Sequence, residues 1–175
     1  MELDEQPALY FWEYYIAMSY YQELIHEQYK QGKKTPFIPM ACPDTGSFVG
    51  WKKCYVNVDA ELLEEDCFGG LILKPNEHYN ERVIVKLLIP EDAKRSSGFS
   101  RRCRCDKAVV LEIQTVDGDP LNDNIVAYSG YDPSFMYVKG ETVVPKAPFC
   151  EDRFEECASG IHFYINRQEA VNNIS

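Results

Sequence analysis

The stretch "ERVIVKLLIP", residues 81–90, decides the fold class because its apolar residues recur at every second position. Alternation with a period of two indicates a β-strand that buries one face. The face expected to be buried holds Val83, Val85, Leu87 and Ile89. Pro90 cannot donate a ladder hydrogen bond, so we expect the strand to end there.

Further strands are expected on both sides of this stretch. A second long strand is predicted over residues 101–116, "RRCRCDKAVVLEIQTV", because the turn signal "DGD" follows it. Shorter strands are predicted within 48–56, 69–75, 124–132, 135–144 and 160–165. A short acidic helix, "DAELLEED", is expected between the first two of these.

Helices are expected at the two ends of the chain. Residues 8–31 are rich in aromatic side chains and lie between Pro7 and Gly32, which suit a helix start and stop. Asn166, with Glu169 three residues on, suits an N-cap with a capping-box partner. We therefore predict an α+β fold: a mostly antiparallel β-sheet with an aromatic-rich N-terminal helix and a short C-terminal helix.

Composition limits the class of protein. Residues 1–45 are expected to form the helix and a proline-rich connector, and residues 46–175 a β-rich core domain. A net charge of −10 disfavours direct nucleic-acid binding and attachment to a membrane surface. The acidic start "MELDEQPAL" lacks the basic region of a signal peptide, so we expect a cytoplasmic protein whose seven cysteines are mostly free thiols.

The cysteines raise the question of a metal site. On an unbroken strand over 101–116, Cys103 and Cys105 share a face with Val109, Leu111 and Ile113, which favours burial as small apolar residues. A zinc site would need Cys150, Cys157 or His162 as further ligands, and their spacing fits no zinc pattern. We expect core cysteines, no metal and no cofactor, with zinc at Cys103, Cys105, Cys150 and Cys157 as the alternative.

A basic segment, "KRSSGFSRR" at residues 94–102, stands out in this acidic chain. Arginine forks and flexible serines suit a phosphate, although charges at a hairpin tip also pair with a protein's own carboxylates. His162 and Tyr164 share one face of their predicted strand and could contact the same ligand. The candidate ligand-binding residues are Lys94, Arg95, Arg101, Arg102, Arg104, His162 and Tyr164. Since no nucleophile accompanies them at a diagnostic spacing, we assign no catalytic residue.

Aromatic and acidic residues are the candidates for binding a partner protein. The aromatic side chains surround much of the N-terminal helix, which suits a partner surface or a homodimer contact as well as burial. The acidic residues could imitate phosphates in a nucleic-acid channel of another protein. The candidate partner-binding residues are Tyr10, Trp12, Tyr14, Tyr21, Glu151, Asp152, Glu155 and Glu156.

Four segments, "IVKLLIPEDAKRSS", "RRCRCDKAVVLEI", "YVKGETVVP" and "CASGIHFYINRQEA", resemble a domain of unknown function in phage and bacterial proteins, some of which carry pentapeptide repeats. The resemblance covers roughly residues 68–171 and implies no catalytic residue. It implies a phage or mobile-element setting, where small acidic proteins often block host defences.

Two functions follow from these observations. The first is a non-enzymatic accessory protein that binds a host protein, such as an anti-CRISPR that inhibits a nuclease-type defence complex. The alternative is a protein or enzyme that binds a nucleotide or another phosphate ligand, such as a signal sponge, through the 94–104 arginines with His162 and Tyr164.

Overall fold

The computed structural model describes residues 6–58, 64–65, 71–72 and 79–173, and side chains are described within 12–56 and 81–173. The chain divides into two compact units, Met1–Pro39 and Met40–Ser175. The first unit holds one long helix, α1 (Gln6–Lys30), which confirms the predicted N-terminal helix. Gly32 follows it with a φ of 66°, a left-handed conformation that glycine adopts freely and that commonly ends helices.

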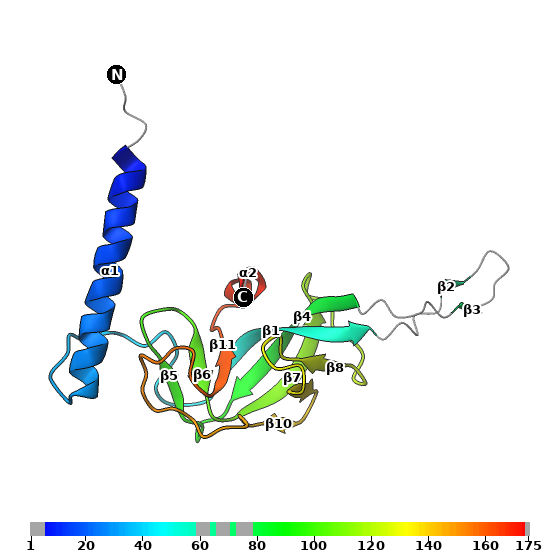
Figure 1. Cartoon of the computed structure of the whole chain (residues 1–175). Helices are drawn as coiled ribbons and strands as arrows, with labels where there is room; N and C mark the ends of the chain where they lie inside the picture. Colours follow the sequence, from blue (N-terminus) through cyan, green and yellow to red (C-terminus); the bar gives the residue numbers. More distant parts are fainter. Residues whose placement is uncertain (1–5, 59–63, 66–70, 73–78, 174–175) are drawn as a thin grey trace. The chain divides into compact units, whose positions relative to one another are not determined.

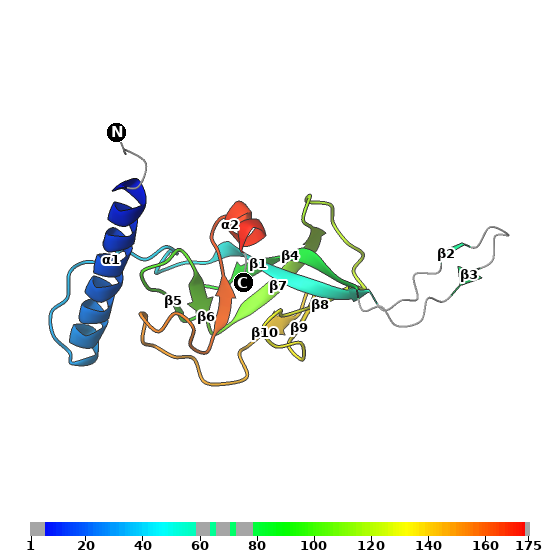
Figure 2. The same ribbon diagram turned by 45° about the horizontal axis from the view of Figure 1, so that its top comes forward.

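The second unit is built on an antiparallel sheet of six strands in the order β10-β7-β4-β1-β8-β9 (Figures 1 and 2). The central strands β1 (Phe48–Val58) and β4 (Tyr79–Ile89) pair along their whole length, from Phe48 opposite Ile89 to Val58 opposite Tyr79. The remaining strands are β7 (Ala108–Thr115), β8 (Val126–Tyr128), β9 (Met136–Val138) and β10 (Thr142–Val143). The predicted strand segment 135–144 turns between β9 and β10 at Gly140, whose φ is 86°.

Two smaller sheets complete the unit. One has the order β11-β6-β5, formed by β5 (Arg95–Ser97), β6 (Cys103–Cys105) and β11 (Ile161–Phe163). The other pairs β2 (Glu64–Glu65) with β3 (Leu71–Ile72). The predicted acidic helix is therefore wrong at 64–65, and the rest of it lies outside the described residues. The short helix α2 (Arg167–Asn172) closes the chain, so the predicted α+β class is confirmed.

The predicted strand over 101–116 is wrong in one respect, because it breaks at Asp106 and Lys107 into two strands of different sheets. Asp106 turns the chain there: its amide donates to Lys94 O (3.1 Å) and its carboxylate accepts from Lys94 N (2.7 Å). The alternation of faces restarts after the break. Ala108 and Val110 are buried, whereas Val109, expected on the cysteine face, is only half-buried.

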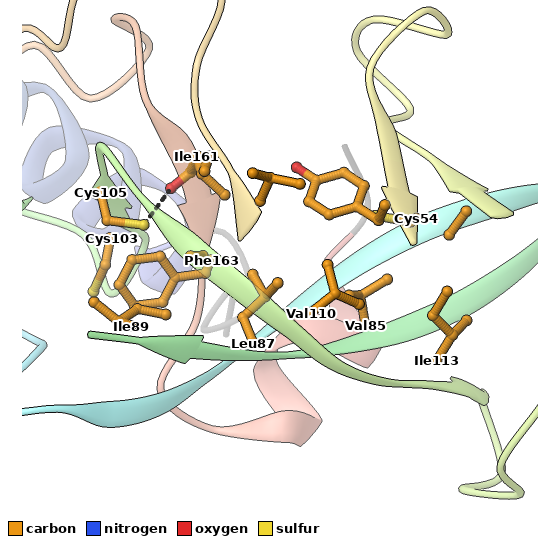
Figure 3. Close-up of a cluster of buried hydrophobic side chains, with 14 of the residues drawn as sticks. Cys54, Val85, Leu87, Ile89, Cys103, Cys105, Val110, Ile113, Ile161 and Phe163 are labelled. Atoms are coloured by element: carbon orange, nitrogen blue, oxygen red, sulfur yellow. Dashed lines mark hydrogen bonds between the residues drawn. The ribbon is translucent and has the colours of Figure 1, made fainter. Parts of the chain in front are cut away.

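A β-bulge then restores part of the predicted face. Lys86 pairs with Glu112 but Leu87 pairs with Val110, so Leu111 is the extra residue of the β7 strand. The bulge returns Ile113 to the buried side, where it is 3% exposed. The core of the second unit, part of which is drawn in Figure 3, also holds all four residues on which the first strand prediction rests: Val83, Val85, Leu87 and Ile89.

The capping prediction for the C-terminal helix is confirmed for Asn166 but not for Glu169. Asn166 caps α2 as expected, because its side chain accepts a hydrogen bond from Gln168 N (2.9 Å). Glu169 does not complete a capping box; its carboxylate binds Arg101 instead. Arg167 fastens the helix to the sheet by donating to Gln114 Oε1 (3.0 Å) and to the Thr115 carbonyl (3.0 Å).

Candidate functional site

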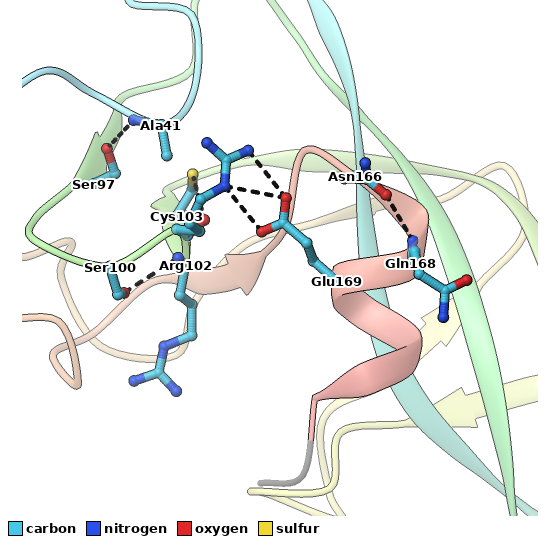
Figure 4. A network of polar contacts seen from close by, with 9 residues as sticks. Ala41, Ser97, Ser100, Arg102, Cys103, Asn166, Gln168 and Glu169 are labelled. Atoms are coloured by element: carbon cyan, nitrogen blue, oxygen red, sulfur yellow. Dashed lines mark hydrogen bonds and ion pairs between the residues drawn. The ribbon is translucent and has the colours of Figure 1, made fainter. Parts of the chain in front are cut away.

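The ends of the basic segment are occupied by the protein's own carboxylates. Lys94 forms an ion pair with Glu151 (2.9 Å). Arg101 binds Glu169 through both its Nε and a terminal nitrogen, at 3.0–3.1 Å (Figure 4). Lys94, Glu151 and Arg101 are largely exposed, whereas Glu169 is half-buried. Each pair raises the pKa of its base, mainly through the hydrogen bond to the acid. This is the self-paired arrangement that the sequence left open for these two residues.

Arg95 holds backbone rather than presenting its guanidinium to a ligand. It donates to four carbonyl oxygens, those of Gly46 (2.5 Å), Pro90 (2.6 Å), Ala93 (3.1 Å) and Glu91 (3.2 Å). Its guanidinium carbon also lies 5.1 Å from the centre of the Phe48 ring. Arg95 is therefore a structural residue that fastens the connector to the turn before β5, which corrects its assignment to a ligand site.

Arg104 is a second correction, since only 2% of it is exposed. We expected it to bind a ligand, but its guanidinium donates to three part-buried backbone carbonyls. These belong to Cys150 (2.9 Å), Ser159 (2.8 Å) and Asp152 (2.8 Å). Burial lowers the pKa of Arg104, yet these acceptors satisfy the charged form. Arg104 thus fastens the loop before β11 onto β6.

The predicted acidic partner residues lie in that same loop and face the basic segment. Glu156 accepts a hydrogen bond from Ser100 N (2.6 Å), and the Phe99 and Phe154 rings stack at 4.5 Å. A Cβ on Gly98 would lie 2.8 Å from the Arg153 carbonyl, so only glycine permits this approach. The basic segment and the acidic loop therefore contact each other. Asp152 caps its own turn through Phe154 N (3.0 Å), and Glu155 is exposed there.

Three predicted ligand residues do come together: Arg102, His162 and Tyr164 line one cavity of about 130 Å³. Figure 4 shows the Arg102 side chain extending away from the paired carboxylate of Glu169. We call this cavity the cationic pocket. Its complete lining is Lys52, Lys53, Tyr55, Arg102, Ser129, Gly130, Tyr131, His162, Tyr164 and Asn173. Lys52 and Lys53 were not predicted as site residues, and their only signal in the sequence is the pair "KK" inside a predicted strand.

The cationic pocket opens at a gap in the pairing of β1. On this edge β8 pairs only with Tyr55 and Val56, and Tyr164 forms an isolated bridge to Trp51. Among the described strands, no ladder partner covers the edge between these two points. Lys52 and Lys53 lie in the gap, where Lys52 Nζ donates to the His162 carbonyl (3.0 Å) and Lys53 Nζ to the Asn173 carbonyl.

The lining has an unusual charge for this protein. It contains Lys52, Lys53 and Arg102 and no aspartate or glutamate, although the chain carries 28 acids and 18 bases. Burial, followed by the charges of Lys52 and Arg102, lowers the pKa of His162 to about 4. The imidazole is therefore neutral at pH 7. Because its Nε2 lies 3.1 Å from the Ala158 carbonyl, that nitrogen carries the proton and Nδ1 is the acceptor.

A second cavity of about 330 Å³ adjoins the first, and we call it the tyrosine cavity. The two share Lys52, Ser129, Tyr131 and His162. Apolar walls come from Phe135, Tyr137, Pro145, Ala147 and Ile161. Arg102 also reaches this side, because it donates to Cys157 Sγ (3.4 Å), and Cys157 lines the tyrosine cavity.

The cysteines do not gather as a metal site among the residues that the structure describes. Cys103 and Cys105 are fully buried in the core, as expected, and Cys105 Sγ approaches the Ile161 carbonyl (3.8 Å; Figure 3). Burial raises the pKa of Cys105 to about 12, which disfavours the thiolate that zinc needs. Cys157 is exposed and contacts Arg102. No group of three ligating atoms joins these thiols within the described part of the chain.

Several aromatic side chains of the first unit are exposed to solvent. Among the predicted partner residues, Trp12 is 63% exposed, Tyr14 64% and Tyr21 45%. Tyr10 lies in α1, and its side chain is outside the described set. Neither helix of the described residues combines the length and the apolarity that crossing a membrane requires.

Comparison with known proteins gives a family without an activity. A curated relative, "Uncharacterized protein L223" of Acanthamoeba polyphaga mimivirus, is 35% identical over 101 residues. These cover 54% of this chain and 64% of the relative, so the chain spans less than two thirds of that protein's length. No solved structure matches. The family model for DUF5758, described as a family of unknown function, matches residues 38–170, which include every lining residue of the two cavities except Asn173, and the chain belongs to that family.

Proposed function

We propose that this protein binds a small phosphate-bearing ligand in the cationic pocket. The observation that carries the proposal is the concentration of Lys52, Lys53 and Arg102, with no carboxylate in the lining, on a chain of net charge −10. A cluster of cationic side chains in a partly enclosed space favours the binding of an anion. Because acids outnumber bases in the chain as a whole, this local excess of bases is a property of the pocket and does not reflect the overall composition.

The donors of the pocket retain capacity for a ligand. Lys52 spends one of its three N–H groups on the His162 carbonyl, and Arg102 one of its five on Cys157. Tyr164 adds a hydroxyl, and partial burial raises the pKa of that phenol, which keeps it a neutral donor. The neutral His162 supplies an acceptor for a ligand hydroxyl or a protonated phosphate oxygen.

Binding is favoured over catalysis by the hydrogen bonds at the site. Within the described residues, none joins His162 to Cys157, Ser129 or Tyr164, and His162 Nε2 is bound to a backbone carbonyl. A nucleophile activated by an adjacent base needs such a contact. Sequestering a phosphate ligand is therefore the form of the proposal that these contacts support best.

The test compares two adjacent arginines. We expect Arg102→Ala to weaken binding of inorganic phosphate or pyrophosphate by about 10- to 100-fold, the usual worth of a hydrogen bond from a charged donor. Arg101→Ala is the matched control, since Arg101 binds Glu169 outside the pocket. Isothermal titration calorimetry measures both. The proposal fails if the wild-type protein binds no phosphate compound, or if the two variants bind equally well.

A second candidate function rests on α1. Large aromatic side chains exposed on a helix, such as Trp12, Tyr14 and Tyr20, commonly mark a binding surface for another protein. A host protein, as in an inhibitor of a nuclease-type defence complex of the anti-CRISPR kind, and a second copy of the chain are the two partners expected from the sequence. A phage setting, an association with pentapeptide repeats and a cytoplasmic location likewise stay predictions.

This second function has its own test. We expect wild-type protein to capture a defined partner from host lysate, and Trp12→Ser with Tyr20→Ser to lose it while phosphate binding persists. Sedimentation velocity distinguishes a second copy from a foreign partner. Capture that is equal for wild type and the double variant would remove α1 from the binding surface.

A further inference from the structure

We infer that the ligand is a ring-bearing phosphomonoester of the nucleoside monophosphate type, with its phosphate in the cationic pocket and its ring in the tyrosine cavity. This inference rests on the proposed function. The two cavities share Lys52, Ser129, Tyr131 and His162, so one ligand can extend through both. Their volumes of about 130 and 330 Å³ suit a compact anionic head joined to a larger group.

Tyr137 gives the tyrosine cavity an unfilled hydrogen-bonding position. Only 1% of this residue is exposed, it lines the cavity, and its hydroxyl has no hydrogen-bond partner among the described residues. Among the described residues, every side-chain oxygen that is fully enclosed has a hydrogen-bond partner. Because the Tyr137 hydroxyl has no such partner, it is not fully enclosed and faces the open space of the cavity that Tyr137 lines. A buried hydroxyl without a partner is unfavourable, and a polar atom on a ligand ring would satisfy it.

The walls around Tyr137 suit a flat ring. The Phe135 and Tyr137 rings lie 5.2 Å apart and are inclined by 53°, and Pro145 and Ile161 add apolar surface. The half-buried Phe135 ring can stack on a planar group, whereas Tyr137 offers its hydroxyl. Burial raises the pKa of Tyr137 well above its usual value, so its hydroxyl is a neutral donor at every physiological pH.

The charges along the combined site favour one phosphate at one end only. Asp132 is the single carboxylate in the two linings, and it belongs to the tyrosine cavity. Its hydrogen bonds to Lys146 and Ser134 lower its pKa to about 2, so it is ionised and paired at pH 7. Lys146, which also lines the tyrosine cavity, is paired with Asp132, so a second phosphate on the ring side would meet this ion pair, whereas the lining of the cationic pocket holds cations and no carboxylate. A phosphate on one side of a ring therefore fits better than a diphosphate that bridges both cavities.

The experiment uses the full chain with inorganic phosphate, adenosine, and the 5′-monophosphates of adenosine, guanosine, cytidine and uridine. By calorimetry, at least one monophosphate is expected to bind 10-fold or more tightly than inorganic phosphate and than adenosine. Tyr137→Phe is expected to weaken that monophosphate by 3- to 10-fold, because one neutral hydrogen bond is lost. It should leave the affinity for inorganic phosphate unchanged.

Tyr128→Phe is the matched control, because Tyr128 lies on the neighbouring strand and lines neither cavity. The inference is overturned if every monophosphate binds no more tightly than inorganic phosphate, or if Tyr137→Phe and Tyr128→Phe bind alike. Either result, obtained while phosphate binding still depends on Arg102, leaves the proposed function standing. Loss of all phosphate binding removes both proposals. Because Tyr137→Phe removes only an unpaired hydroxyl, we expect it to fold with an unchanged or higher melting temperature.

Discussion

Replacing Arg104 by alanine tests whether the loop that carries Cys157 and Ser159 is held by a buried charge. Arg104 lies on β6 and donates to the carbonyls of Cys150, Ser159 and Asp152, at 2.8–2.9 Å. It also contacts Ser96 Oγ (3.3 Å). Since Cys157 and Ser159 line the tyrosine cavity, the loop and the candidate site depend on the same contacts.

The expected loss of stability follows from the groups left behind. Each buried acceptor without a donor costs about 1–3 kcal/mol. In Arg104→Ala the Cys150 carbonyl loses its donor, whereas the carbonyls of Asp152 and Ser159 keep only the amides of Glu155 (3.2 Å) and Cys150 (3.4 Å). Water that enters the space left by the side chain satisfies part of the loss. The guanidinium also lies 5.1 Å from the Phe149 ring centre, a contact worth about 0.5–2 kcal/mol. We expect the free energy of unfolding to fall by about 2–4 kcal/mol, from the lost hydrogen bonds and the lost ring contact together.

Urea denaturation followed by tryptophan fluorescence measures this change. A loss of that size moves the unfolding midpoint by on the order of 2 M urea. Arg101→Ala is the control, because its ion pair with Glu169 is 62% exposed on the arginine side, and such pairs contribute less than about 1 kcal/mol. Arg104→Lys should recover only part of the loss, since an ammonium lacks the planar fork. If Arg104→Ala and Arg101→Ala destabilise equally, the buried-anchor reasoning is refuted.

Three further changes test other parts of the second unit. Lowering the pH from 6.5 to 4 should reduce the free energy of unfolding by at most about 3 kcal/mol through His162. The pKa of His162 is about 4 in the folded protein, so the unfolded chain takes up that proton at a higher pH and is stabilised first. Urea titrations at several pH values should show a flatter profile for His162→Gln. Gly50→Ala should lower the melting temperature by several degrees, since a Cβ there would lie 2.6 Å from Phe163 Cδ2; an unchanged value would contradict the packing. Asn166→Ala should destabilise by about 1 kcal/mol through loss of the cap on Gln168 N, and Asn166→Asp should restore it in the same thermal melts.

Local patterns predicted the elements whose structure depends on neighbours in sequence. The alternation from Val83 to Ile89 predicted both β4 and its buried face, since the period of side chains along a strand is a property of the backbone. Asn166 predicted the start of α2 because a cap acts on amides two or three residues away. The same reasoning placed His162 and Tyr164 on one face, and both line the cationic pocket.

What the sequence by itself determined is therefore the α+β class, the two terminal helices and the buried face of β4, where the apolar residues alternate regularly. Only the tertiary structure decided that Arg104 is buried, because its acceptors lie 46–55 residues away on a loop with no regular pattern. The same holds for the cationic pocket, where Lys52 meets His162 across 110 residues. Strand pairing and register select these neighbours, and no local period records which edge of β1 is left open.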